Sequence, residues 1–225
     1  MDDNVNKGHR DRLKTRFLNE GLQGFPPHQV LELLLFFGIP YKDTNEYAHR
    51  LITEYGSLSG VLNADYRDLA AFKGIGPHAA LLLKLIPELA RRYAMDRWKD
   101  RPQIKNVADA GLYASTLFIG LEHEAFYMIC MNAQNRVINP ALISEGTVNE
   151  AMVYPRIILE NAFRFNCVTA IFAHNHPGGS TEPSRADIEM TKKLKKALEC
   201  VSIQVMDHII VAGGDYLSMA EKCFI

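Results

Sequence analysis

The stretch AHNHPGGSTEPSRAD, residues 173–187, limits the possible folds more than any other part of the chain. Side chains alternate across a β-strand, so His174 and His176 point to the same side of a strand that ends near them. The proline that follows cannot donate to a strand ladder, and the two glycines after it permit a sharp loop. Ser184 and Asp187 then suit the start of a helix. The stretch therefore predicts a strand, a loop and a helix that bring two imidazoles and one carboxylate together.

Two imidazoles and one carboxylate, with water in the fourth position, are typical of a catalytic zinc site. Each part of the pattern also has a simpler explanation. A single H-x-H is a weak signal, Ser184-x-x-Asp187 is a helix-capping pattern, and paired glycines occur in ordinary turns. Together, at this spacing, they predict one zinc ion per chain, bound by His174, His176 and Asp187.

Composition and charge exclude several other classes of protein. The formal net charge is −1, so no overall field attracts nucleic acid or a membrane surface. The four cysteines lie far apart without a C-x-x-C pair, which favours reduced thiols over disulfides or a thiolate zinc site. The first residues lack the apolar run of a signal peptide, and no apolar stretch is long enough to cross a bilayer. We expect a cytoplasmic protein that does not associate with membranes.

The hydrophobic pattern divides the chain into two domains and a linker. Residues 1–96 carry apolar side chains at three- and four-residue spacings, which predicts a helical domain. Residues 97–106 are charged and poor in aliphatic side chains, as a linker would be. Residues 107–225 mix short apolar runs with helical patterns, which predicts a domain of the α/β or α+β class. We expect strands at 124–132 and 167–174, helices at 154–163 and 184–199, and a hairpin at 203–217.

The helical domain contains a candidate phosphate-binding turn, Lys73-Gly74-Ile75-Gly76, between two helical patterns. Its glycines would bare the backbone N–H groups of residues 74–76 at a helix N-terminus, where they can bind a phosphate without reading sequence. A Gly-x-Gly turn is also a plain way to join two packed helices, so a structural or protein-contact role is the alternative. We expect at most weak, non-specific DNA binding by residues 1–100. A modest group of basic residues would support it: Lys7, Arg10, Arg12, Lys14 and Arg16.

Several motifs resemble those of the bacterial RadC family across essentially the whole chain. They include GHRDRLKTRFL, KGIGPHAALLLKLIPEL, ISEGTVNEAMVYPR, AHNHPGGSTEPSRADIEMT and MDHIIV. The C-terminal domain of that family resembles the JAMM (MPN-type) metalloproteases, whose motif is matched here by His174, His176, Ser184 and Asp187. The resemblance implies a helix-hairpin-helix domain followed by a JAMM-like (cytidine-deaminase-like) mixed-sheet domain, so the fold class is α+β/α/β. Gly178 stands where the family usually has serine, at a position that is not a ligand.

The resemblance also implies catalytic residues beside the metal. JAMM enzymes use an upstream glutamate as the general base, at the start of a strand that lies before the histidine strand. Glu124 begins such a strand here and is the first choice, and Glu145 is the second. The hydroxyl of Ser184 would donate a hydrogen bond to the developing oxyanion. Glu122 and Glu150 are the remaining candidates for the base.

Asp207 and His208 are adjacent on an expected strand, so their side chains point to opposite faces. We expect His208 to be an ordinary buried histidine with no part in the site. The alternative is that one of the two residues braces a metal ligand through a hydrogen bond.

The leading hypothesis is a zinc-dependent hydrolase of JAMM type, which cleaves a peptide or isopeptide bond in an unknown peptide or protein by metal-activated water. The alternative is a DNA-binding protein associated with DNA repair, as the RadC name implies, whose metal site is structural or acts on nucleic acid. A zinc deaminase is disfavoured because the H-x-E and P-C-x-x-C motifs are absent.

Overall fold

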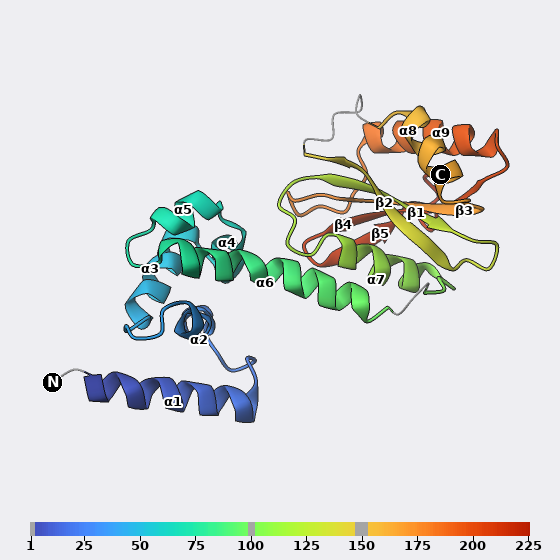
Figure 1. Ribbon diagram of the computed structural model, residues 1–225. Helices are drawn as coiled ribbons and strands as arrows, with labels where there is room; N and C mark the ends of the chain where they lie inside the picture. The colour runs from blue at the N-terminus through green and yellow to red at the C-terminus, as the bar shows by residue number, and fades with distance from the viewer. Residues whose placement is uncertain (1–2, 99–101, 147–152) are drawn as a thin grey trace. The chain divides into compact units, whose positions relative to one another are not determined.

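The computed structural model describes residues 3–98, 102–146 and 153–225. It divides the chain into two compact units, Met1–Leu89 and Ala90–Ile225. The described part of the first unit is helical, and the second unit contains a five-stranded mixed sheet (Figure 1). The expected order of a helical region followed by an α+β domain is confirmed.

The first unit packs around leucines that recur at helical spacing, as the sequence predicts. Leu31, Leu35, Leu51, Leu69 and Leu83 are fully buried in one cluster. The last helix of the unit begins with Gly76 and Pro77, because a proline in the first turn loses no helical hydrogen bond. The helices are α1 (Asp3–Glu20), α2 (Pro27–Gly38), α3 (Asn45–Tyr55), α4 (Leu58–Asn63), α5 (Tyr66–Ala71) and α6 (Gly76–Asp96), and the division between the units falls within α6.

The second unit has three layers, with the sheet in the middle. Helix α7 (Val107–Leu117) covers one face, and α8 (Pro155–Arg164) and α9 (Arg185–Glu199) cover the other (Figure 1). The strand order is β2-β1-β3-β4-β5. Strands β3 and β4 are parallel, and the other neighbouring pairs are antiparallel. The strands are β1 (Ala125–Met131), β2 (Val137–Glu145), β3 (Thr169–Asn175), β4 (Gln204–Ala212) and β5 (Asp215–Ser218).

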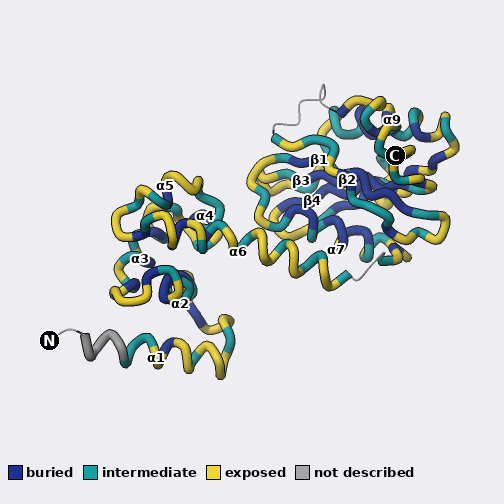
Figure 2. Tube along the Cα trace, viewed as in Figure 1, coloured by how far each residue is buried: buried dark blue, intermediate teal, exposed yellow. Residues whose placement is uncertain are grey.

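Alternation along the central strands separates two cores. Ile171 and Ile209 pack with the side chains of α7, whereas Phe172 packs with those of α8 and α9. Figure 2 shows the central strands as the most continuously buried part of this unit. His174 lies two residues beyond Phe172 and so faces the side of α8 and α9.

The segment expected to be a linker, 97–106, is packed at both of its described ends. Trp98 meets Tyr113 edge-to-face with ring centroids 5.4 Å apart. Ile104 is buried in the core on the α7 side, and its N–H donates to the carbonyl of Asn135 at 2.9 Å. Residues 99–101 lie outside the described residues. Charge and the scarcity of aliphatic side chains predict a linker, although a tryptophan and an isoleucine in the segment have partners in the second unit.

Within the described residues, no helix combines the length and the apolar character that crossing a membrane requires.

Candidate metal centre

The end of β3 and the first turn of α9 bring the three predicted ligands together. Their ligand atoms all lie within 4.8 Å of one another. Nε2 of His174 is 2.8 Å from Nε2 of His176. Oδ1 of Asp187 is 3.5 Å from Nε2 of His174, and Oδ2 of Asp187 is 3.7 Å from Nε2 of His176. This group of side chains could hold a metal ion.

Backbone hydrogen bonds set the direction of the His176 ring. The N–H of His176 donates to the carbonyl of Val211 at 2.8 Å, which continues the pairing with β4 beyond the end of β3. The chain then turns at Gly179, whose φ of +87° is readily available to glycine. The turn brings the carbonyl of Ser180 to 2.7 Å from Nδ1 of His176. A carbonyl can only accept, so Nδ1 is the donor and Nε2 is left to face the other two ligands.

Burial and charge set the protonation states of the three ligands. Burial lowers the pKa of His174 to about 4, so this imidazole is neutral near pH 7. Burial opposes ionisation of Asp187, but the neighbouring His176 ring and hydrogen bonds from Ser184 hold its pKa well below the usual range. The neighbouring Asp187 carboxylate raises the pKa of His176. His174 and Asp187 therefore have the protonation states that a metal requires.

Ser184 caps α9 and orients Asp187 at the same time. The Asp187 N–H donates to Oγ of Ser184 at 3.1 Å. In return, the Ser184 N–H and hydroxyl donate to Oδ2 of Asp187 at 2.8 Å and 2.7 Å. The capping pattern and the ligand pattern seen in the sequence are therefore two roles of one structure, because the cap fixes the carboxylate beside the histidines.

Glu124 lies at the same site. It immediately precedes β1, which pairs antiparallel with β3 so that Phe126 is opposite His174. A cavity of about 190 Å³ is lined by Glu124 together with His174, His176, Ser184, Ala186, Asp187 and Met190. The structure therefore brings the predicted base and the predicted ligands to one cavity, and their roles stay predictions.

The other candidate glutamates for the base are less well placed. Glu145 forms a 2.7 Å ion pair with His123, in which both side chains are about half exposed. Glu122 is exposed. Neither residue lines the cavity that holds Glu124. Glu150 lies outside the described residues.

Asn175, which lies between His174 and His176, forms hydrogen bonds to the backbone on both sides of Glu124. Its Oδ1 accepts from the Ala125 N–H at 2.7 Å, and its Nδ2 donates to the His123 carbonyl at 3.0 Å. The Asn175 side chain is buried. No local sequence pattern reveals this residue, because its partners lie far away in the chain.

Asn175→Ala is expected to destabilise the second unit. The change leaves the buried N–H of Ala125 without its acceptor, which costs about 1–3 kcal/mol. Chemical denaturation of the full chain measures the loss. His123→Ala is the matched control, because it removes an exposed ring beside the same backbone and should change stability by only about 0.5 kcal/mol. Equal stabilities for the two variants would contradict this role of Asn175.

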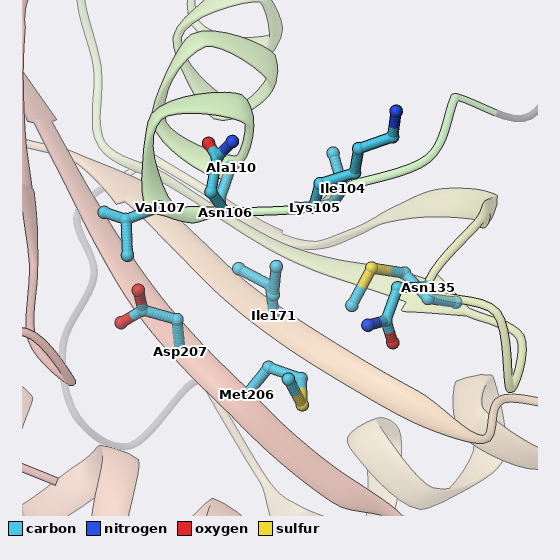
Figure 3. A pocket seen from close by; sticks show the side chains of 10 residues that line it. Ile104, Lys105, Asn106, Val107, Ala110, Asn135, Ile171, Met206 and Asp207 are labelled. Carbon is cyan, nitrogen blue, oxygen red and sulfur yellow. The ribbon is translucent and has the colours of Figure 1, made fainter.

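His208 contacts a predicted ligand, whereas Asp207 does not. Nε2 of His208 lies 2.7 Å from Nδ1 of His174. Asp207 points to the opposite face of β4 and lines a separate cavity of about 170 Å³ near Val107 (Figure 3). Its carboxylate accepts from the Ser218 hydroxyl at 2.5 Å and the Ala220 N–H at 3.0 Å. His208 is buried, as expected of a structural histidine, and it also contacts a predicted ligand, as the bracing alternative requires, so its role stays a prediction.

The candidate phosphate-binding turn joins α5 to α6. The expectation that its three N–H groups are bare is wrong for Ile75, whose N–H donates to the carbonyl of Phe72 at 3.0 Å. The side chain of Ile75 is buried in the core of the first unit. Gly74 has a φ of +101° and lies against Tyr47, so a Cβ there would come within 2.4 Å of the tyrosine ring. Lys73 is exposed. Packing therefore explains part of this motif.

Some basic residues of α1 are bound within the first unit. Arg10 donates to the carbonyl of Ile39 at 2.7 Å and also to those of Pro40 and Lys42. Arg16 pairs with Glu20 and donates to the carbonyl of Gly24. These contacts leave fewer free cations than the sequence suggests. Arg12 and Lys14 are exposed, and the side chain of Lys7 lies outside the described residues.

Comparisons with known proteins match the whole chain. Residues 104–224 match the family model described as RadC-like JAB domain. The chain is 34% identical over 232 residues to a UPF0758 protein of Fusobacterium nucleatum subsp. nucleatum, with 100% of both chains covered. It is 36% identical over 215 residues to a UPF0758 protein of Pseudoalteromonas translucida, with 95% of this chain and 96% of the relative covered. These similarities extend over both compact units.

Proposed function

The chain belongs to the RadC family, and from this premise we propose that it is a zinc-dependent hydrolase of JAMM type that cleaves a peptide or isopeptide bond. One observation carries the proposal: Glu124 lines the same cavity as His174, His176 and Asp187. A purely structural metal site has no need of an additional carboxylate. A hydrolytic site needs a base beside its metal.

The three ligands fit a zinc ion. Zinc bonds to nitrogen and oxygen of about 2.0–2.2 Å put the ligand atoms of a tetrahedral site about 3.3 Å apart. The observed separations of 2.8, 3.5 and 3.7 Å lie on both sides of that value. Imidazole and carboxylate are common zinc ligands, and three of them leave one position for water or substrate.

Each residue of the cavity has a separate role in the proposed hydrolysis. Zinc, when bound, supplies Lewis acidity that polarises a carbonyl and lowers the pKa of water to about 7. The carboxylate of Glu124 takes a proton from the attacking water and passes it to the leaving amine. His174, His176 and Asp187 fix the position at which the scissile carbonyl meets that water.

Ser184 stabilises the oxyanion in this proposal. To do so, its hydroxyl must first break its hydrogen bond to Asp187. The hydroxyl has a single proton, which is donated to Asp187 at 2.7 Å. That proton must turn from Asp187 to the substrate as the oxyanion develops. The Ser184 N–H, which also donates to Asp187, holds the carboxylate during this change.

Removal of the metal tests the proposed activity. We expect the zinc-loaded full chain to cleave members of a library of peptides and isopeptide-linked peptides. Chelation should abolish cleavage, and added zinc should restore it, because the metal held by these ligands is the only electrophile in the proposal. Mass spectrometry of the products locates the broken bond. Cleavage that persists after complete chelation would exclude a metal-dependent mechanism.

DNA binding by the first unit is the second candidate function, with the metal site then structural or directed at nucleic acid. Lys73 is exposed next to the N-terminus of α6, and a Cβ added at Gly76, which has a φ of +71°, would meet no other atom within 4 Å. Both features favour access by a phosphate. The internal contacts of Ile75, Arg10 and Arg16 limit the strength of such binding.

We expect any DNA binding to be weak and independent of sequence. With two or three phosphate contacts, log affinity should fall with log salt at a slope of about −2 to −3 for duplex DNA. Lys73→Glu should weaken binding in a fluorescence-anisotropy titration. Lys42→Glu, the same charge change at another exposed position of the unit, is the control. Tight or sequence-selective binding, or binding unaffected by Lys73→Glu, would contradict this expectation.

A further inference from the structure

Two buried side chains outside the ligand set connect two of the proposed ligands to each other. Nδ1 of His174 lies 2.7 Å from Nε2 of His208. Nδ1 of His208 lies 2.6 Å from Oγ1 of Thr191. The Thr191 hydroxyl donates to the backbone carbonyl of Asp187 at 2.5 Å, one helical turn earlier in α9. A single chain of hydrogen bonds therefore runs from one ligand to another through β4 and α9.

The number of protons available determines which atom is the donor in each of these hydrogen bonds. The carbonyl of Asp187 can only accept, so the single hydroxyl proton of Thr191 goes to it. Oγ1 of Thr191 must then accept from His208, which places a proton on Nδ1 of His208. His208 and Thr191 are fully buried, and a charged imidazole is costly there. A neutral His208 with its proton on Nδ1 has a lone pair on Nε2.

The same reasoning identifies the donor in the hydrogen bond between His208 and His174. Because Nε2 of His208 accepts, Nδ1 of His174 must be the donor in the 2.7 Å hydrogen bond. His174 is also buried, and as a neutral imidazole it has one proton. Its Nε2 is then left with a lone pair, directed at His176 and Asp187.

We propose that Thr191 and His208 are positioning residues that hold His174 in the tautomer able to bind metal through Nε2. The inference rests on the proposed zinc site and adds the groups that prepare it before the metal arrives. Without a fixed tautomer, His174 could place its proton on Nε2, where it would block the metal. Outer hydrogen-bond partners of this kind orient ligands in other metal proteins.

Nitrogen NMR of the histidine rings tests the inference directly in the metal-free full chain. Long-range ¹H–¹⁵N spectra distinguish a protonated ring nitrogen from one with a lone pair. We expect His174 and His208 both to carry their proton on Nδ1. A proton on Nε2 of His174 in the wild-type protein would overturn the inference, and this measurement needs no variant to fold.

Thr191→Val removes the hydroxyl and keeps the shape of the side chain. It leaves Nδ1 of His208 without an acceptor, so the proton should shift to Nε2 of His208 and the His174 tautomer should reverse. We expect zinc affinity, measured by competition with a chelating dye, to fall about 10- to 100-fold. Thr191→Ser keeps the hydroxyl and should restore both the tautomer and the affinity. Loss of affinity in both variants would indicate a packing effect and overturn the inference.

The outcomes separate this inference from the proposed function. If the wild-type protein binds no zinc, the proposed function fails, and the NMR spectra still decide the tautomer. If the wild-type protein binds zinc and Thr191→Val binds it equally well, the proposed function stands and the positioning role is wrong.

Discussion

The purified full chain, loaded with zinc and desalted, is expected to keep one zinc ion per chain, and His176→Ala is expected to keep almost none. His176 supplies one of three ligands whose atoms lie within 4.8 Å of one another. Removal of a ligand should weaken binding by more than the roughly 10- to 100-fold lost when only an outer hydrogen-bond partner changes. Elemental analysis of both proteins measures the ratio of zinc to chain.

His123→Ala is the matched control for this experiment. His123 is a second histidine near the start of β1, but its ring pairs with Glu145 and lies outside the cluster. Its removal should leave the zinc content unchanged. Circular dichroism should show that both variants keep the secondary structure of the wild type. Equal zinc in His176→Ala and the wild-type protein would remove the central claim of the proposed function.

The ligand cluster could be predicted from the sequence because its geometry is local. Alternation on a strand puts His174 and His176 on one side, and the proline and glycines that follow force the loop. The cap at Ser184 then sets the position of Asp187. Each of these effects acts over a few residues. The placement of Glu124 needed the family resemblance as well, because it depends on the pairing of β1 with β3.

The supporting contacts could not be predicted because they join distant segments. Thr191 and His208 come into contact only when α9 packs on β4. The partners of Asn175 are backbone groups at the start of β1, about 50 residues earlier in the chain. The helix α7 was missed, although Asn106 caps it. The full length of β2 was missed because its pattern is irregular and includes Pro140, which a sheet tolerates at an edge strand.

The candidate phosphate-binding turn, residues 73–76, shows the opposite error. Its local sequence pattern predicts more exposed backbone N–H groups than the fold allows. The glycines do form a turn between two helices, as expected. Burial of Ile75 and the contact of Gly74 with Tyr47 give the motif a packing role that its sequence does not reveal. A short motif sets backbone conformation, and the surrounding core decides which of its groups stay available to a ligand.

Glu124→Gln is expected to lower the rate of hydrolysis by about 10²- to 10⁴-fold, the usual contribution of a positioned general base. Glutamine has nearly the same shape as glutamate but cannot take a proton from water. Glu124 lines the cavity without belonging to the ligand cluster, so zinc content and stability should persist. The turnover rate with a cleaved peptide from the library, measured on zinc-loaded protein, gives the size of the effect.

Glu145→Gln is the control that separates a base from a nearby charge. Glu145 is about half exposed and paired with His123, so the same chemical change there should alter turnover by less than about tenfold, well short of the contribution of a base. Zinc lost from Glu124→Gln would make Glu124 a metal ligand instead of a base. Full activity in Glu124→Gln together with a large loss in Glu145→Gln would transfer the role to Glu145. Full activity in both variants would show that neither carboxylate acts as the base.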